Sequence, residues 1–246
     1  MSLQSFEGKT VPQVTFKLHE NNQWVETNSA ELFDNKTVVV FSLPGAFTPT
    51  CSSTHLPRYE ELAPAFKAAG VDSILCVSVN DGFVMEAWGA DQGVHNVRLI
   101  ADGNGEFTEG MGMLVGKEAI GFGKRSWRYS MYVKDGIVDK MFIEPDVEGD
   151  PFLVSDADTM LNHIAPAAAK PEQVALFTKP GCPFCTTAKE ALNAANVSYF
   201  EMPLADNVRQ RLLSAVAGRA TSPQMFVDGA LVGGSDDILS WIKARA

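Results

Sequence analysis

The chain has 246 residues, 46% of them hydrophobic and 20% charged, which is typical of a globular protein with room for two domains. Its net charge is −10: residues 1–165 hold 12 Lys and Arg against 23 Asp and Glu, which gives −11, and residues 166–246 hold 8 against 7, which gives +1. This acidity argues against a nucleic-acid partner. No run approaches the roughly 18 apolar residues that span a bilayer. Residues 1–7 also lack a signal-peptide pattern, so we expect a cytoplasmic protein without a membrane partner, with its thiols reduced.

Strand and helix patterns alternate along residues 1–165. The β-branched run Thr37–Ser42 is typical of a strand buried on both faces, and Asp135-Gly136 between two apolar alternations indicates a hairpin. Alternation of this kind predicts a mixed α/β sandwich. The expected strands are 11–18, 23–26, 37–42, 71–79, 97–101, 128–133 and 137–143. One expected helix begins after residue 51, and a second covers 83–90.

The segment Pro44–Cys51 follows the first buried strand and opens a helix. A thiol at a helix start lies among unpaired backbone N–H groups at the positive end of the helix dipole, which favour thiolate over thiol. The pattern Pro44-x-x-x-Thr48-x-x-Cys51 resembles the peroxidatic loop of peroxiredoxins. This resemblance covers roughly residues 3–163 and is closest to the peroxiredoxin 5 subfamily.

The resemblance implies roles for the residues around Cys51. Arg128 matches the active-site arginine of the family, with Arg125 as the second choice. Cys51 beside Arg128 would be a thiolate at neutral pH, Thr48 would hydrogen-bond the incoming peroxide, and Pro44 would shield the pocket from bulk water. The guanidinium would stabilise the charge that moves across the breaking O–O bond. The residues alone also allow Cys51 to be a capped structural thiol.

Several positions near this pattern stay open. Cys76 lies in an apolar run and is interpreted as a buried core thiol without a redox role. His55 falls one turn after Cys51, so it either tunes the thiolate or is a packing or surface histidine. Three aromatic residues either line the pocket or fill the core: Phe47, Trp88 and Trp127.

Residues 165–173 are flanked by prolines and poor in large apolar side chains. Because prolines keep such a stretch extended or turn-like, we interpret it as a linker; the alternative is a surface loop inside one domain. The expected organisation is a larger domain over 1–165, a linker over 166–173 and a smaller domain over 174–246.

The C-terminal part has the pattern of a small, complete α/β domain. An apolar run leads into Cys182-Pro183-Phe184-Cys185, which places two thiols one turn apart at a helix start. Cys182 is expected to be the exposed nucleophile of low pKa, and Cys185 a shielded thiol one turn later. The expected strands are 174–177, 197–201, 225–227 and 231–232, and the expected helices start at 183, cover 208–217 and start near 236.

Three motifs of residues 173–246 resemble those of a dithiol glutaredoxin: Cys182–Cys185, Ser222-Pro223 after Thr221, and Gly233–Asp237. The resemblance implies a cis peptide bond at Pro223, which exposes the Ser222 backbone to glutathione. The glutathione-binding residues that it implies are Lys179, Thr221, Ser222, Pro223, Gly234, Ser235 and Asp236. The family usually has Val at the position of Ser222. Because the backbone makes the contact with glutathione, this difference does not alter the expected binding site.

Two other uses of the cysteines at 182 and 185 remain. A zinc site would need four ligands, and Cys51, Cys76 and the four His residues of the chain show no matching spacing. An iron–sulfur-carrying role is known in the glutaredoxin family, mostly among relatives with a single cysteine. We therefore expect no metal and no cofactor.

Together the two resemblances imply an α/β protein of two thioredoxin-like domains. Residues 148–157, where some peroxiredoxins carry a resolving cysteine, contain none, so a sulfenic acid on Cys51 needs an external thiol. We expect a glutathione-dependent peroxidase for H2O2 and small alkyl hydroperoxides, with glutathione as reducing co-substrate. It would form a homo-oligomer in which peroxiredoxin and glutaredoxin domains meet. The alternatives are a peroxide sensor or relay to partner proteins, and a chaperone-like assembly.

Overall fold

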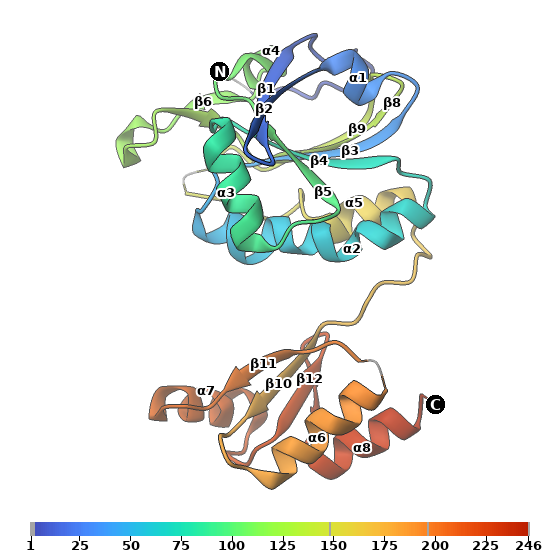
Figure 1. The fold of residues 1–246 in the computed structure, drawn as a ribbon, viewed down its shortest axis with the longest axis vertical. Coiled ribbons are helices and arrows are strands. Elements are labelled where there is room, and N and C mark those ends of the chain that lie inside the picture. Colours follow the sequence, from blue (N-terminus) through green and yellow to red (C-terminus); the bar gives the residue numbers. More distant parts are fainter. Residues whose placement is uncertain (1–2, 148, 196, 246) are drawn as a thin grey trace. The chain divides into compact units, whose positions relative to one another are not determined.

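The computed structural model describes residues 3–147, 149–195 and 197–245. It divides into two compact units, residues 1–170 and 171–246, and the division falls inside the segment expected to be a linker (Figure 1). Each unit has its own hydrophobic core and its own sheet. The predicted α/β class is confirmed in both.

A five-stranded sheet forms the centre of the first unit, in the order β5-β4-β3-β8-β9. Strands β3, β4 and β5 run parallel, β8 is antiparallel to β3, and β9 is antiparallel to β8. The run Val38–Phe41 in β3 is fully buried, as its β-branched sequence predicts. The strand bounds are β1 Thr15–Glu20, β2 Gln23–Asn28, β3 Thr37–Ser42, β4 Ser73–Ser78, β5 Val97–Ala101, β6 Leu114–Gly116, β7 Lys124–Ser126, β8 Tyr129–Lys134 and β9 Ile137–Ile143.

Helices cover both faces of this sheet. In Figure 1, α2 and α5 lie on one face, and α1 and α4 on the other. The stripe of Leu56, Tyr59, Leu62 and Phe66 on α2 is buried, which explains its apolar spacing. The helix bounds are α1 Ser29–Phe33, α2 Leu56–Ala68, α3 Gly82–Gln92, α4 Glu106–Gly110 and α5 Ala157–Ile164.

Three strands begin two or more residues later than predicted, each for an identifiable reason. The predicted strand 11–18 begins only at Thr15, because Val11 donates its N–H to Gly136 O instead of pairing with β2. The predicted strand 71–79 is shorter because the Val71 N–H bonds to Phe66 O and closes α2. Likewise the predicted strand 197–201 shifts to 200–203, because the Val197 N–H bonds to Leu192 O at the end of the preceding helix.

The second unit is a four-stranded sheet in the order β11-β10-β12-β13, with β10 parallel to β11 and antiparallel to β12. Helices α6 and α8 lie side by side in Figure 1 and pack on the core of Leu176, Leu192 and Met225. The bounds are β10 Val174–Thr178, α6 Pro183–Ala194, β11 Phe200–Pro203, α7 Asn207–Ala217, β12 Gln224–Val227, β13 Ala230–Gly233 and α8 Ser235–Lys243.

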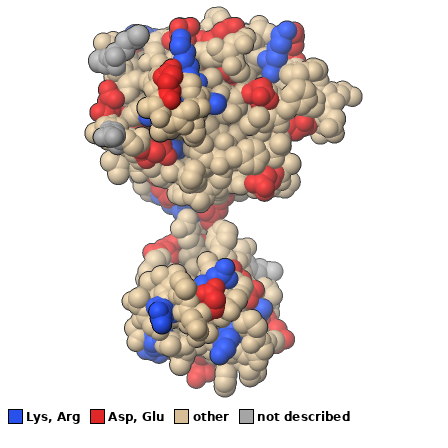
Figure 2. Space-filling view, turned by 90° about the vertical axis from the view of Figure 1, so that its left-hand side faces the viewer, with Lys and Arg blue, Asp and Glu red and all other residues tan. Residues whose placement is uncertain are grey.

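The surface carries charges of both signs. On the face shown in Figure 2, acidic and basic side chains are interspersed, without a continuous basic patch. In the part of the chain that the structure describes, no helix is both long and apolar enough to cross a bilayer.

Candidate active sites

Cys51 lies between the central strand β3 and the helix α2. After β3 a loop leads to Pro49, which suits the first turn of a helix because it has no N–H to leave unpaired. Residues Cys51–His55 then form a π-helical turn, in which Leu56 donates its N–H to Cys51 O. The side chain of Cys51 is fully buried. Such turns are often found at functional sites.

Arg128 provides the positive charge beside this sulfur. It lies directly before β8, is only 1% exposed, and its Nη1 is 3.5 Å from Cys51 Sγ. Its Nη2 donates to both carboxylate oxygens of Asp150 at 2.6 Å. Burial alone would lower the pKa of Arg128, but the negative charges of Cys51 and Asp150 outweigh burial and raise it. The guanidinium is therefore a fixed cation at the sulfur.

The second-choice arginine is placed elsewhere. Arg125 lies in β7, and its guanidinium donates to the backbone carbonyls of Phe122 and Val79. The structure therefore brings Arg128, and not Arg125, to Cys51.

His55 lies at the other end of the π-helical turn and is completely buried, so a surface position is wrong. Its Nδ1 accepts from Arg128 Nη1 at 3.0 Å, and its Nε2 faces Ser155 O at 3.2 Å. Burial, and then the charge of Arg128, lower the pKa of His55 to about 3. The imidazole is thus neutral at physiological pH, with its proton on Nε2. His55 therefore fills the core and also orients the guanidinium of Arg128.

A cavity of about 300 Å³ is lined by Thr50, the residue before Cys51, and by Asp150, the partner of Arg128; Cys51 itself is not among its lining residues. The hydroxyl of Thr48 donates to Gly45 O at 2.8 Å, which leaves its oxygen lone pairs to accept from a hydroperoxide O–H. The cavity lining is Pro44, Thr48, Pro49, Thr50, Lys117, Ile120, Phe122, Gly149 and Asp150.

The remaining side chains singled out from the sequence are mostly packing groups. Cys76 is buried in β4, and burial raises the pKa of its thiol well above the ordinary value. Trp88 and Trp127 are buried and fill the core, with their indole N–H groups bonded inside the protein. Phe47 is 53% exposed and adopts a left-handed backbone conformation with φ 60°.

The second thiol site, which is the dithiol Cys182 and Cys185, lies at the start of α6. Cys182 is the N-cap residue, and the Cys185 N–H donates to its Sγ at 3.3 Å. Burial works to raise the pKa of Cys182, but the hydrogen bonds from Cys185 and the facing Ser222 outweigh it and lower that pKa. Cys185 is 2% exposed, and burial raises its pKa. Cys182 is half-buried and more accessible than the buried Cys185, which is the expected order of exposure; their roles as nucleophile and shielded thiol stay a prediction.

Two backbone segments frame Cys182. The Ser222-Pro223 bond is cis, as predicted, and Cys182 Sγ lies 3.6 Å from Ser222 O. The N–H of Gly234, the N-cap of α8, donates to the Asp237 carboxylate at 2.9 Å. The N–H groups of the first α8 residues, Ser235 and Asp236, are thus the ones left to face a ligand. The side chain of Lys179 is exposed, and Thr221 Oγ1 accepts from the Gln224 amide.

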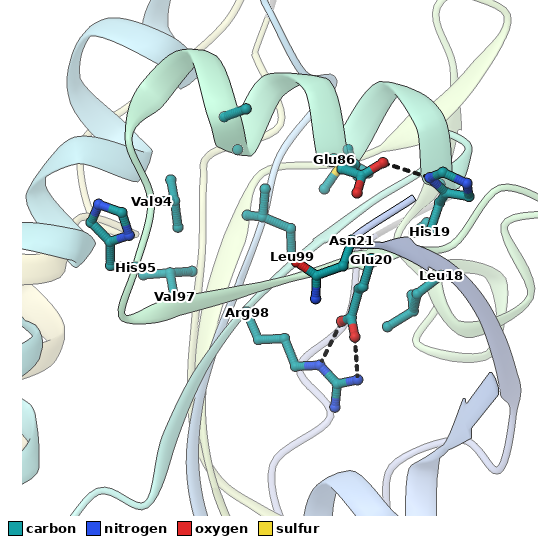
Figure 3. A pocket seen from close by; sticks show the side chains of 15 residues that line it. Leu18, His19, Glu20, Asn21, Glu86, Val94, His95, Val97, Arg98 and Leu99 are labelled. Atoms are coloured by element: carbon teal, nitrogen blue, oxygen red, sulfur yellow. Dashed lines mark hydrogen bonds and ion pairs between the residues drawn. The ribbon is translucent and has the colours of Figure 1, made fainter. Parts of the chain in front are cut away.

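A larger cavity, of about 540 Å³, lies between β1, α3 and β5 (Figure 3). Its charged side chains are paired within the protein: His19 with Glu86, and Arg98 with Glu20. Among the described residues, none of those lining it is a cysteine, and no group of three or more His, Cys, Asp and Glu is placed to hold a metal ion. The thiol chemistry therefore belongs to the two sites above.

Comparison with known proteins covers both units. The Redoxin family model matches residues 6–161, and the Glutaredoxin family model matches residues 174–232. "Hybrid peroxiredoxin hyPrx5" of Haemophilus influenzae is 61% identical over 236 residues, 96% of this chain and 98% of the relative. The chain belongs to the hybrid peroxiredoxins.

Other relatives match only the peroxiredoxin domain. Peroxiredoxin sll1621 of Synechocystis is 54% identical over 65% of this chain and 91% of its own length. The crystal structure of reduced Prx3 from Vibrio vulnificus in complex with H2O2 is 41% identical, covers 65% of this chain and 99% of that one, and has a TM-score of 0.62. The predicted family is confirmed, and the hybrid peroxiredoxin is a thiol peroxidase.

Sequence reasoning missed two carboxylates of the peroxiredoxin domain. Asp150 binds Arg128, and the buried Glu144 accepts the backbone N–H groups of residues 153–155. Burial works to raise the pKa of Glu144, but these donors outweigh it and lower the pKa. The only sequence signal for these two contacts was the acidic character of residues 144–150. The hybrid peroxiredoxin therefore uses this segment to hold the guanidinium.

Proposed function

We propose that this hybrid peroxiredoxin reduces H2O2 and small alkyl hydroperoxides, with glutathione as the reductant. One observation carries the proposal: Cys51 Sγ is fully buried and 3.5 Å from the Arg128 guanidinium, whose partner Asp150 lines a small and largely apolar opening. A sulfur in this position is protected from bulky reagents and is stabilised as an anion. The size of the opening favours small hydroperoxides.

In the first step the Cys51 thiolate attacks the hydroperoxide. An S–O bond forms while the O–O bond breaks, and the leaving alkoxide or hydroxide takes a proton as an alcohol or water; Cys51 becomes a sulfenic acid. Arg128 stabilises the charge that moves onto the leaving oxygen. Thr48 accepts the hydroperoxide O–H, and Pro44 keeps bulk water out of the opening.

The second step uses glutathione, because residues 149–157 offer no thiol. Its thiol condenses with the sulfenic acid, water leaves, and Cys51 carries a mixed disulfide. The Cys182 thiolate then attacks the glutathione sulfur and releases Cys51 as a thiolate. A second glutathione attacks the new mixed disulfide at Cys182, leaves as glutathione disulfide and completes the cycle. If Cys185 attacks instead, glutathione leaves, and two glutathione molecules then reduce the Cys182–Cys185 disulfide and leave as glutathione disulfide.

The glutaredoxin domain would bind glutathione along two backbone segments. The cis bond before Pro223 turns the Ser222 backbone toward the tripeptide, next to Cys182. The free N–H groups at the start of α8 suit a carboxylate. The residues proposed for this site are Lys179, Thr221, Ser222, Pro223, Gly234, Ser235 and Asp236.

The test is steady-state peroxide consumption with glutathione and no other protein. Cys51→Ser abolishes it, because no other described thiol has the Arg128 environment. Cys182→Ser removes most turnover but leaves one stoichiometric oxidation of Cys51, seen by mass spectrometry, while Cys185→Ser is milder. Full turnover by Cys182→Ser would refute the relay, and no turnover by the intact chain would favour a sensor.

Two further proposals concern the assembly state of the protein and its compartment. We propose a homo-oligomer formed through the peroxiredoxin domain, which sedimentation equilibrium tests. The cytoplasm stays the predicted compartment, because the dithiol Cys182–Cys185 needs a reducing environment to work as proposed.

A further inference from the structure

The guanidinium of Arg128 has almost no hydrogen left for a substrate. Of its five N–H bonds, the two at Nη1 face Cys51 Sγ and His55 Nδ1, and Nη2 is held by both oxygens of Asp150. Nε is buried and has no partner among the described residues. An anionic group that entered the opening would therefore find the outer nitrogen already occupied by a carboxylate.

Asp150 also places a negative charge where a substrate enters. It lines the opening together with the apolar side chains of Pro44, Ile120 and Phe122, and its own side chain is 44% exposed. Lys117 lines the opening too, but its ammonium lies 4.5 Å from the centre of the Trp127 ring. Arg128 itself is 1% exposed, so an approaching molecule meets the carboxylate before the guanidinium.

We propose that Asp150 is a specificity-determining residue that restricts the Cys51 site to uncharged hydroperoxides. It disfavours hydroperoxides that carry a carboxylate or another anionic group near the O–O bond. This inference rests on the proposed peroxidase function and refines its substrate class. The physical reason is repulsion between like charges at the partly exposed opening, added to the loss of a free cationic partner. The apolar lining accommodates the alkyl part of a neutral substrate.

The experiment compares two hydroperoxides that differ only in charge, 3-hydroperoxy-3-methylbutanoate and its methyl ester. Oxidation of Cys51 is followed by stopped-flow tryptophan fluorescence in the full-length reduced protein, and H2O2 serves as the reference. The proteins are the wild type, Asp150→Asn and Asp146→Asn. Asp146→Asn is the matched control, because Asp146 is an exposed carboxylate four residues before Asp150 and its loss changes the net charge equally.

The measured quantity is the ratio of the second-order rate constants, ester over acid. We expect this ratio to fall about tenfold in Asp150→Asn, the effect of one nearby charge in a partly screened site. It stays unchanged in Asp146→Asn. Added salt lowers the ratio in the wild type and leaves it unchanged in Asp150→Asn, because salt screens the repulsion between Asp150 and the anionic hydroperoxide.

The outcomes separate this inference from the function on which it rests. An unchanged ratio in Asp150→Asn, while the wild type still oxidises Cys51 with H2O2, overturns the specificity role alone. A wild type that is inert toward all three peroxides refutes the peroxidase function itself. If Asp150→Asn fails to fold, the salt dependence in the wild type decides: a ratio that does not respond to salt overturns the inference.

Discussion

The buried histidine beside the guanidinium makes the stability of the peroxiredoxin domain depend on pH. Burial and the charge of Arg128 lower the pKa of His55 to about 3 from its ordinary value of 6.5, while its bond to Ser155 O opposes the shift only partly. The unfolded chain binds a proton at this ring below about pH 6.5, and the folded domain binds it only near pH 3. Stability is therefore fully present above pH 6.5 and falls as the pH is lowered toward 3.

The size of this effect follows from the two pKa values. Within the window each pH unit costs about 1.4 kcal/mol, so the ring accounts for a loss of about 2 kcal/mol between pH 7 and pH 5. Other titrating groups add their own contributions. The variant His55→Asn has no titrating side chain there and keeps a polar atom beside Arg128. Comparing it with wild-type His55 isolates the contribution of the ring.

The assay is urea unfolding at pH 7 and pH 5, in a Trp241→Phe background. The remaining tryptophans, Trp24, Trp88 and Trp127, all lie in residues 1–170, so their fluorescence reports this unit alone. We expect the free energy of unfolding to fall by about 2 kcal/mol more in the protein with His55 than in His55→Asn. An equal fall in both proteins would show that the ring is not buried and neutral, and would refute the reasoning.

Two further predictions concern the dithiol and the acidic segment. Iodoacetamide at neutral pH modifies Cys182 well before Cys185, because the pKa of the first thiol is lowered and that of the second is raised; peptide mass spectrometry over a pH series measures both, and equal rates would contradict the assignment. Glu144→Gln lowers the stability of the peroxiredoxin domain by about 1–3 kcal/mol, because three backbone donors lose a charged acceptor. Amide hydrogen exchange in residues 153–155 accelerates in this variant, and unchanged protection would show that the carboxylate is dispensable.

Features that depend on neighbouring residues were predictable from the sequence. The run Thr37–Ser42 forms the central strand because its β-branched side chains suit burial on both faces. Asp135-Gly136 forms a turn with two positive φ angles, as its residue types require. The helix start at Cys182 followed from Pro183 at the first position. In each case the local chemistry already determines the backbone.

Features that depend on distant residues were not predictable. The contacts of Arg128 with Cys51, His55 and Asp150 join positions separated by 77, 73 and 22 residues, and no local pattern encodes them. Helix α5 was missed for another reason. It is short, and its two local signals were overlooked, the N-cap Asp156 and the helical spacing of the apolar residues Ala157, Met160, Leu161 and Ile164. Tertiary packing, rather than propensity, determines such elements.

The burial of Cys51 has a consequence for the order of events during turnover. A molecule as small as H2O2 can pass the opening, whereas a tripeptide cannot touch a sulfur with no exposed surface. If glutathione is the reductant, as proposed above, the stretch from 51 to 55 has to open once per cycle to admit it. This stretch is a single π-helical turn at the start of α2, a geometry found frequently at functional sites. Reduction, and not oxidation, is then the step that a more rigid variant would slow.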